Sequence, residues 1–254
     1  MQSRYILGMR VDAPRVAQAV EYITDLAASG SGGYICVATV HMVMEAYDSE
    51  NFRQTVNGAS LVVPDGMPLV WALRLMGITG AERVDGMSLT PVLLAEAQRR
   101  GLAVGFYGST PEVLASIQRR VRHLYPQLKL QYLFSPPFRP LSQPEEGQVI
   151  RDIESSRVQL LFVGLGCPKQ EQWMARMFNR LSAVLVGVGA AFDVLAGLRR
   201  RAPVWMQKAG LEWFYRLGQE PRRLWRRYLY HNPRFVYYFA RQLLGRQFSS
   251  PATT

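Results

Sequence analysis

Asp65 is the residue of this 254-residue chain whose surroundings most clearly suggest chemistry. It follows the apolar run 61–64 (LVVP) and precedes Gly66, so a carboxylate stands where a short buried strand is expected to end. A carboxylate in that position could serve as a general base. The same residues also fit a plain turn, because Pro-Asp-Gly is a common turn sequence. The residues alone leave both interpretations open.

Two glycine-rich turns follow other predicted strands, at 108–111 (GSTP) and 164–171 (GLGCPKQE). Such turns let backbone N–H groups at the start of a helix approach a phosphate. They also occur where a strand merely packs closely on its helix. Neither turn matches a P-loop, and the segment 187–191 (GVGAA) lacks the last glycine of a dinucleotide fingerprint. An oxidoreductase with a dinucleotide cofactor is therefore disfavoured.

Metal chemistry is not expected from the pattern of ligand residues. The three histidines, His41, His123 and His231, are scattered along the chain, and no Asp-x-Asp pair is present to hold a sugar-nucleotide metal ion. The two cysteines, Cys36 and Cys167, cannot form a disulfide framework or a cysteine-based zinc site. Cys167 lies in the second glycine turn and could line a site there.

Apolar runs alternate with amphipathic segments through most of the chain. Strands are predicted at 34–39, 61–63, 103–107, 128–134, 158–163 and 183–188, and helices at 14–28, 41–51, 89–100, 111–125, 145–155 and 170–181. This alternation favours a Rossmann-like α/β domain, a mostly parallel sheet with helices on both faces. In such sheets ligands bind beyond the carboxyl ends of the strands, where Asp65 and the glycine turns fall. The strand order cannot be read from the pattern.

Nearly all of the net charge of +11 lies at the C-terminal end. Residues 1–197 hold 18 basic and 17 acidic residues, whereas 198–254 hold 12 basic and 2 acidic ones. On a helical wheel from Leu224, an apolar and aromatic face opposes a face of arginines. We therefore expect an α/β domain at 1–197 and a basic, amphipathic helical appendage at 198–254. Such a helix suits an acidic membrane surface, although a helix packed on the core with a solvated arginine face fits the same pattern.

Targeting and membrane-spanning segments are not evident in the sequence. Arg4, Arg10 and Asp12 interrupt any apolar run near Met1, and the longest mostly apolar stretch, 183–198, contains several glycines and Asp193. The expected location is cytoplasmic, with contact to the membrane but no crossing of it. Nucleic-acid binding is not expected, because no recognised DNA- or RNA-binding motif is present.

Several blocks together resemble the WecG/TagA/CpsF glycosyltransferase family of bacterial envelope polysaccharide assembly. They occur in the family's order, from about residue 35 to 230, and the blocks GxPKQE and LEWxYR are specific. The matching blocks are 63–66 (VPDG), 82–86 (ERVDG), 105–108 (GFYG), 164–171 (GLGCPKQE), 187–193 (GVGAAFD), 201–205 (RAPVW), 210–217 (GLEWFYRL) and 220–221 (EP).

The resemblance implies an inverting, metal-independent transferase with no cofactor. Its donor would be a UDP-sugar and its acceptor a polyprenyl-diphosphate-linked saccharide at the cytoplasmic face of the membrane. Asp65 would be the general base that deprotonates the acceptor hydroxyl. Of the residues at matching or neighbouring positions, the tail arginines Arg216, Arg223 and Arg226 would close over the site and neutralise diphosphate. The others would bind donor or acceptor in the cleft: Thr39, His41, Arg83, Gly108, Gly166, Lys169, Gln170 and Glu171.

The chain departs from the family pattern after the first strand. The family usually has Thr-x-Asn where this sequence has Thr39-Val40-His41, and this leaves the donor sugar open. The aromatic extension 231–248 is closer to exopolysaccharide members that add glucose than to members that add N-acetylmannosamine or its uronic acid. The alternative to an enzyme is a non-catalytic adaptor, which would bind acidic membrane or nucleic acid through the appendage. Exposed apolar surface could also pair subunits into a homo-oligomer.

Overall fold

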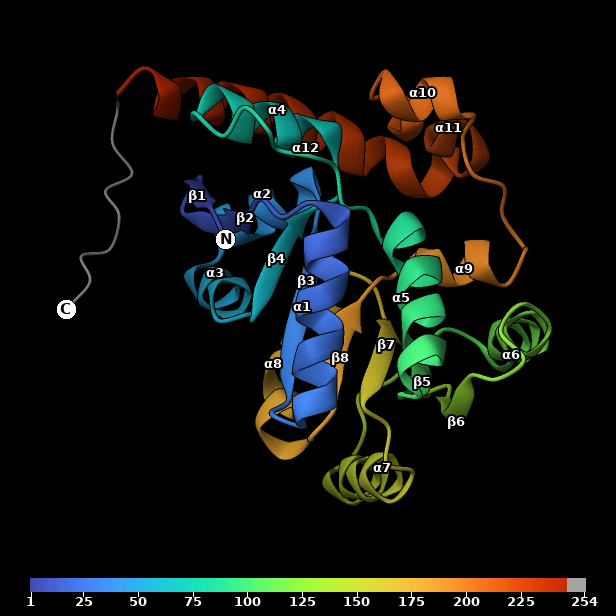
Figure 1. Cartoon of the computed structure of the whole chain (residues 1–254). Coiled ribbons are helices and arrows are strands. Elements are labelled where there is room, and N and C mark those ends of the chain that lie inside the picture. Colours follow the sequence, from blue (N-terminus) through green and yellow to red (C-terminus); the bar gives the residue numbers. More distant parts are fainter. Residues whose placement is uncertain (246–254) are drawn as a thin grey trace.

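A six-stranded parallel sheet forms the centre of this computed structural model, which describes residues 1–245 apart from the side chains of Lys208 and Arg223 (Figure 1). The strand order is β4-β3-β8-β7-β5-β6, and every pairing in this sheet is parallel. The inner strands are almost wholly buried, which explains their near-continuous apolar sequences. The predicted parallel α/β sheet is confirmed. Its strands are β3 (Gly33–Ala38), β4 (Leu61–Pro64), β5 (Ala103–Gly108), β6 (Lys129–Phe134), β7 (Leu160–Gly164) and β8 (Val184–Gly187).

Helices cover both faces of the sheet, because alternate residues of each inner strand point to opposite sides. In β3, Cys36 and Ala38 belong to one apolar core, whereas Ile35 and Val37 belong to the other. The first core is covered by α2 (Val40–Asp48), α3 (Glu50–Asn57), α7 (Gln143–Ser155), α8 (Lys169–Met177) and the short turn η1 (Phe178–Arg180). The second is covered by α1 (Val16–Ser29), α5 (Gly86–Arg100), α6 (Pro111–Leu124) and α9 (Ala191–Leu195).

An antiparallel hairpin, β1 (Ser3–Ile6) and β2 (Met9–Asp12), packs beside β4 and was not predicted. Its turn is made by Leu7 and Gly8, which both have positive φ. The carboxylate of Asp12 accepts a hydrogen bond of 2.8 Å from the backbone N–H of Val62. This contact satisfies a donor on the outer strand β4, which has no further strand beside it in the six-stranded sheet.

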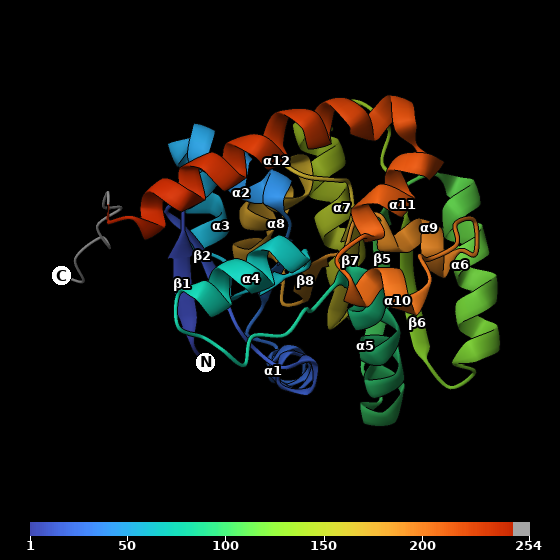
Figure 2. The ribbon, with the colours of Figure 1, turned by 90° about the horizontal axis from the view of Figure 1, so that it is seen from above.

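The appendage crosses the carboxyl edge of the sheet and does not extend away from it (Figures 1 and 2). It contains α10 (Val204–Lys208), α11 (Glu212–Gln219) and α12 (Pro221–Leu243). The predicted helical character of this region is confirmed, and α12 runs unbroken through Pro233 as one helix. Leu224, Phe235 and Phe239 are its buried anchors.

Helix α12 lies along α2 of the α/β body. The guanidinium of Arg234 forms two hydrogen bonds with the carboxylate of Asp48, of 2.8 and 2.6 Å, and the rings of Tyr47 and Tyr238 lie 4.6 Å apart. Near its end, the Gln242 side chain accepts from the N–H of Leu7 and donates to the carbonyl of Tyr5. Within residues 1–245, no helix has both the length and the apolar character needed to cross a membrane.

Candidate active site

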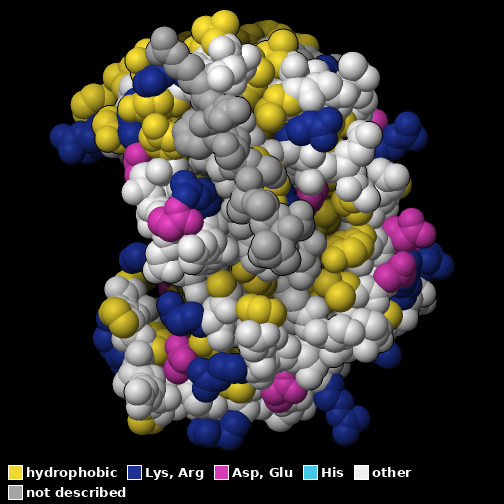
Figure 3. Space-filling view, turned by 90° about the vertical axis from the view of Figure 1, so that its left-hand side faces the viewer, with side chains coloured by type: hydrophobic (Ala, Val, Ile, Leu, Met, Phe, Trp, Pro, Cys, Tyr) yellow, Lys and Arg dark blue, Asp and Glu magenta, His cyan; other side chains and the backbone are white. Residues whose placement is uncertain are grey.

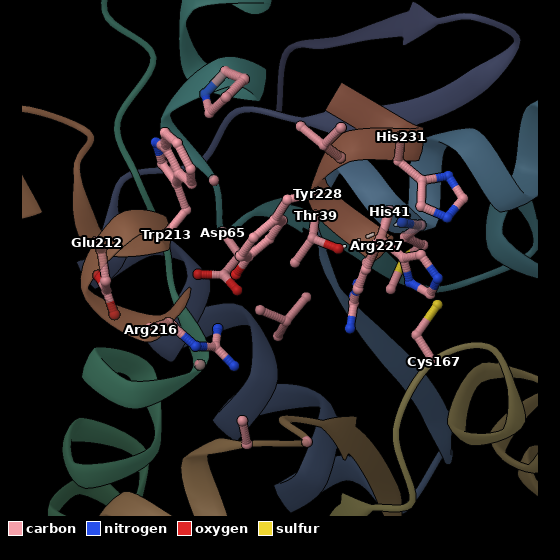
Figure 4. A pocket seen from close by; sticks show the side chains of 18 of the residues that line it. Thr39, His41, Asp65, Cys167, Glu212, Trp213, Arg216, Arg227, Tyr228 and His231 are labelled. Carbon is pink, nitrogen blue, oxygen red and sulfur yellow. Dashed lines mark hydrogen bonds between the residues drawn. The ribbon is translucent and has the colours of Figure 1, made fainter. Parts of the chain in front are cut away.

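A cavity of about 380 Å³ opens where the strands β4, β3, β8 and β7 end side by side. Its floor comes from the turns after these strands, and its roof comes from α11 and α12 of the appendage (Figure 4). The chain leaves β3 toward β4 on one side, whereas β8 lies on the other, so the cavity sits at a point where the strand order reverses. Ligands of open α/β sheets bind at such a point.

Asp65 lies on the cavity wall directly after β4, and its backbone is held from two sides. Its N–H donates to the carbonyl of Ala38 over 2.8 Å, and the carbonyl of Pro64 accepts from the N–H of Val84 over 2.9 Å. The second bond draws the segment 82–86 against β4 and so brings Arg83 next to Asp65. The Arg83 guanidinium donates to the Asp65 backbone carbonyl, and its Nη2 lies 3.3 Å from Oδ1 of the Asp65 carboxylate.

Burial raises the pKa of Asp65 to about 6, because a carboxylate loses solvation there. The positive charges of Arg83 and Arg216 oppose this rise. The negative charges of Asp85 and Glu212 add to it. In Figure 4 the carboxylate of Asp65 and the guanidinium of Arg216 border the same open space. At neutral pH Asp65 is therefore mostly ionised, yet it is a stronger base than an ordinary aspartate.

Two carboxylate–arginine contacts tie the appendage to the body at the same edge. Nη1 of Arg83 lies 2.7 Å from Oε2 of Glu212 in α11. Asp85, which caps the start of α5 by accepting from the N–H of Ser88, also accepts two hydrogen bonds from Arg201, of 2.7 and 2.8 Å. Arg83 thus contacts Asp65 on one side and the roof of the cavity on the other.

The glycine turn after β7 brings Gln170 against the turn after β8. Oε1 of Gln170 accepts from the N–H of Gly189 over 3.1 Å, and a Cβ at Gly187 would lie only 2.5 Å from Nε2 of Gln170. Nε2 also donates to Glu171, a fully buried carboxylate whose pKa is raised by desolvation. The glycine at 187 is therefore required by the close approach of Gln170.

Eight of the predicted site residues line the cavity together, and three lie elsewhere. Gly108 lies at the end of β5, where a Cβ would be 2.5 Å from the carbonyl oxygen of Gly164, so strand packing accounts for this glycine. Lys169 and Arg226 are exposed, and the guanidinium of Arg226 lies over the ring of Trp225. The side chain of Arg223 is outside the described residues. The eight lining residues are Thr39, His41, Asp65, Arg83, Gly166, Gln170, Glu171 and Arg216.

The roof contains lining residues that were not predicted as site residues, among them Trp213, Arg227, Tyr228 and His231. Arg227 and Tyr228 fell on opposite faces of the helical wheel, yet both border the cavity. Because α12 crosses the site, residues from more than one face of the helix can reach it. Cys167, in the second glycine turn, also lines the cavity, as its position suggested it could.

The expectation that the three histidines lie apart is wrong for His41 and His231. Helix α12 returns over α2, so the two imidazole rings meet edge to face with centroids 4.8 Å apart. Nε2 of His41 lies 3.3 Å from Oε1 of Glu45, and Nε2 of His231 lies 3.9 Å from the same oxygen. Burial lowers the pKa of His41 to about 3 and also lowers that of His231, so both rings are neutral at physiological pH.

The fold is α/β and its cavity lies between the sheet edge and the appendage, and comparison with known proteins identifies the class of the protein. The model of the WecG/TagA/CpsF glycosyl transferase family matches residues 4–249. Two proteins of Staphylococcus aureus, from strains MW2 and NCTC 8325, are each 30% identical to this chain over 239 residues. The match covers 93% of this chain and 91% of theirs. Both are named N-acetylglucosaminyldiphosphoundecaprenol N-acetyl-beta-D-mannosaminyltransferase. The chain belongs to the WecG/TagA/CpsF family and is a glycosyltransferase.

Proposed function

We propose that this enzyme transfers a sugar from a UDP-sugar to a polyprenyl-diphosphate-linked saccharide, with inversion at the anomeric carbon and without a metal ion in the transfer step. The observation that carries the proposal is the partly buried Asp65 carboxylate, which faces the cavity and has a pKa raised to about 6. The names of the S. aureus relatives support an acceptor of this class. The transferred sugar would be glucose, N-acetylmannosamine or a uronic acid of these.

Asp65 would act as the base in a single displacement. Its carboxylate takes the proton of an acceptor hydroxyl while that oxygen attacks the anomeric carbon. The bond from this carbon to the UDP oxygen breaks on the opposite face, and UDP leaves with the bonding electrons. Arg83, held against Asp65 at 3.3 Å, would keep the carboxylate pointed at the acceptor.

The leaving diphosphate would be stabilised by arginines of the roof. Arg216 and Arg227 both line the cavity, and guanidinium groups bind phosphate oxygens through two parallel hydrogen bonds. The backbone of Gly187 to Ala190, held in place by Gln170, would face the nucleotide. Thr39 and His41 would contact donor or acceptor at the mouth of β3.

The appendage would hold the enzyme on the membrane that carries the acceptor. Figure 3 shows hydrophobic side chains gathered at the end of the molecule where α4 (Met67–Leu75) and α12 lie, with basic side chains among them. Several aromatic rings there have an arginine over them: Arg226 on Trp225, Arg234 on Tyr230 and Arg241 on Tyr237. Rings at headgroup depth beside arginines are the arrangement expected of an interfacial helix. We define this exposed apolar surface as Trp71, Leu75, Trp225, Leu229, Tyr230, Val236, Tyr237, Leu243 and Leu244.

On this proposal the two parts of the chain have separate tasks. Residues 1–197 would carry the base and the donor-binding turns, whereas 198–254 would supply the roof and the membrane contact. The enzyme would work as a peripheral protein on the cytoplasmic face of the membrane, and Arg226, exposed in this structure, would contact either diphosphate or lipid phosphate. The same surface could pair two copies of the chain.

A donor screen tests the proposal. The full-length protein is incubated with a panel of UDP-sugars and a short-chain polyprenyl-diphosphate-linked saccharide, and released UDP is measured. We expect release with one donor and only when acceptor is present. A non-catalytic adaptor would instead release no UDP with any donor and would bind polyanions with strong salt dependence.

A further inference from the structure

We propose that His41, Glu45 and His231 form a binding site for a divalent transition-metal ion such as Zn²⁺, which would join helix α12 of the appendage to helix α2 of the body. One ligand atom from each of these three side chains lies within 4.8 Å of the other two. Two of the groups come from α2 and the third from α12. This site is distinct from the transfer chemistry proposed for Asp65, which lies on the other side of the open space in Figure 4.

The distances suit a tetrahedral ion with little movement. Ligand atoms about 2.1 Å from zinc at tetrahedral angles lie roughly 3.4 Å from one another. Nε2 of His41 is 3.3 Å from Oε1 of Glu45, and Nε2 of His231 is 3.9 Å from it. A small rotation of the His231 ring would bring all three atoms to one ion. Two imidazoles and one carboxylate leave a fourth position open, as zinc sites of this composition do.

The protonation states also suit a metal. Imidazole binds metal only when it is neutral, and burial keeps both rings neutral. Charges of both signs lie near the two imidazole rings. Arg227 and Arg234 contribute positive charge, and Glu45 and Asp48 contribute negative charge. The hydrogen bonds of the protein leave one nitrogen of each ring unsatisfied: within the described part of the chain, Nδ1 of His41 and Nδ1 of His231 are buried without a hydrogen-bond partner.

Access for an ion is available through the cavity. His41 and His231 both line it, and Cys167 points its sulfur toward His41 from the turn after β7 (Figure 4). A bound ion would connect α2 and α12 beside the Asp48–Arg234 pair and so hold the roof of the cavity to the body. Because the ion would bind the folded protein and not the unfolded chain, it would also raise the melting temperature.

The test uses the full-length protein freed of any histidine tag. It is titrated with Co²⁺ followed by visible absorption, and then with Zn²⁺ in competition with a chromophoric chelator. We expect one equivalent of Co²⁺ to give a tetrahedral spectrum that Zn²⁺ abolishes, and Zn²⁺ to raise the melting temperature. His231→Gln and His41→Asn should each weaken Zn²⁺ binding at least tenfold and remove the thermal shift.

A matched control is available in His123, an exposed histidine of α6, whose replacement in His123→Asn should change nothing. Glu45→Gln keeps both imidazoles and serves as a second variant if a histidine replacement disturbs folding, which circular dichroism will show. Wild-type protein that binds Zn²⁺ no more tightly than His231→Gln or Glu45→Gln overturns the proposal, as does equal loss in His123→Asn. Because every readout is metal binding or melting, failure here is separate from failure of the proposed sugar transfer.

Discussion

The α/β body and the appendage differ in how fully each buries its apolar side chains. The inner strands of the body are buried on both faces between two apolar cores, of which one lies wholly within the body and the other also includes Phe235 and Phe239 of α12. The appendage buries few large apolar side chains, chiefly Leu224, Phe235 and Phe239, and leaves Leu229 68% and Tyr237 58% exposed. Ion pairs add to these apolar contacts with the body, among them those of Glu212 with Arg83 and of Arg234 with Asp48. The exposed apolar residues of the appendage agree with the proposed contact outside the chain, whereas the buried apolar residues of the body serve folding.

Both regions also contribute charged side chains to the cavity. The body supplies the carboxylate of Asp65, and the appendage supplies Arg216 and Arg227. The body also contributes Arg83 and the appendage Glu212, so each region brings charges of both signs to the cavity. Variants in each region separate the two contributions.

The largest effect of changing the appendage is expected at Arg216. Arg216→Gln removes a cation that would stabilise the leaving diphosphate, so kcat should fall roughly 100- to 1000-fold, as for loss of one preorganised donor. Binding to lipid vesicles should be unchanged. Arg222→Gln is the matched control, because Arg222 is an exposed arginine of α12 that does not line the cavity. Equal losses in both variants would mean that the effect comes from net charge alone.

A smaller effect is expected at the exposed apolar surface. The double variant Trp225→Ser/Leu229→Ser removes two side chains that would enter the headgroup region, and each is worth on the order of 1.5–3 kcal/mol when fully buried. Binding to vesicles containing phosphatidylglycerol should fall at least tenfold in a sedimentation assay. Phe138→Ser, at a 93% exposed aromatic of the body, should leave binding intact. Unchanged binding of the double variant would remove the membrane role of this surface.

The buried Asp65 carboxylate should lower the stability of the folded protein at neutral pH, although the proposed catalysis requires it. Its pKa in the folded state, about 6, lies above the ordinary aspartate value of 3.8, so between these pH values the folded state holds a proton that the unfolded chain releases. Stability therefore falls as pH rises from about 4 to 6 and stays lower at pH 7. Asp65→Asn should raise the melting temperature at pH 7 by a few degrees, with a smaller gain at pH 4. A lower melting temperature at pH 7 would contradict the raised pKa.

The pH dependence of kcat/KM shows the smallest expected effect, the influence of the appendage on the pKa of Asp65 in the body. kcat/KM should fall tenfold per pH unit below about pH 6, as the Asp65 base becomes protonated. Glu212→Gln removes a negative charge of the appendage that helps to raise this pKa, so the acid limb should move to lower pH by a fraction of a unit. Movement in the other direction would show that the appendage does not tune the base in this way.

The body was predictable from the sequence in its main features, because local signals and tertiary burial agree there. Helix α6 begins at Pro111, the first residue of the predicted helix 111–125, and the Thr110 side chain caps it by accepting from the N–H of Val113. The β1–β2 hairpin was missed because its strands are four residues long and include Arg4 and Arg10. The strand order had no local signal, since it depends on how crossovers pack.

The site was predictable only where a residue follows a strand of the body. Asp65 directly follows β4 and Gln170 lies in the first turn of α8 after β7, and the segments after parallel strands must gather at one edge of the sheet. The residues that α12 contributes to the cavity could not be predicted in this way, because a helical wheel gives the faces of a helix but not the part of the protein on which the helix packs. His41 and His231 meet only because α12 returns over α2, a contact between distant parts of the chain that carries no pattern in either segment.

Turnover of Asp65→Asn is the most direct test of the central claim that this carboxylate is the base for sugar transfer. With the donor and lipid-linked acceptor identified by the screen, released UDP is measured for wild-type enzyme, for Asp65→Asn and for Asp25→Asn, an exposed aspartate of α1. We expect a loss of about 1000-fold in Asp65→Asn. Asp25→Asn should keep full activity, and both variants should give normal circular dichroism. Near wild-type UDP release by folded Asp65→Asn would show that Asp65 is not the base.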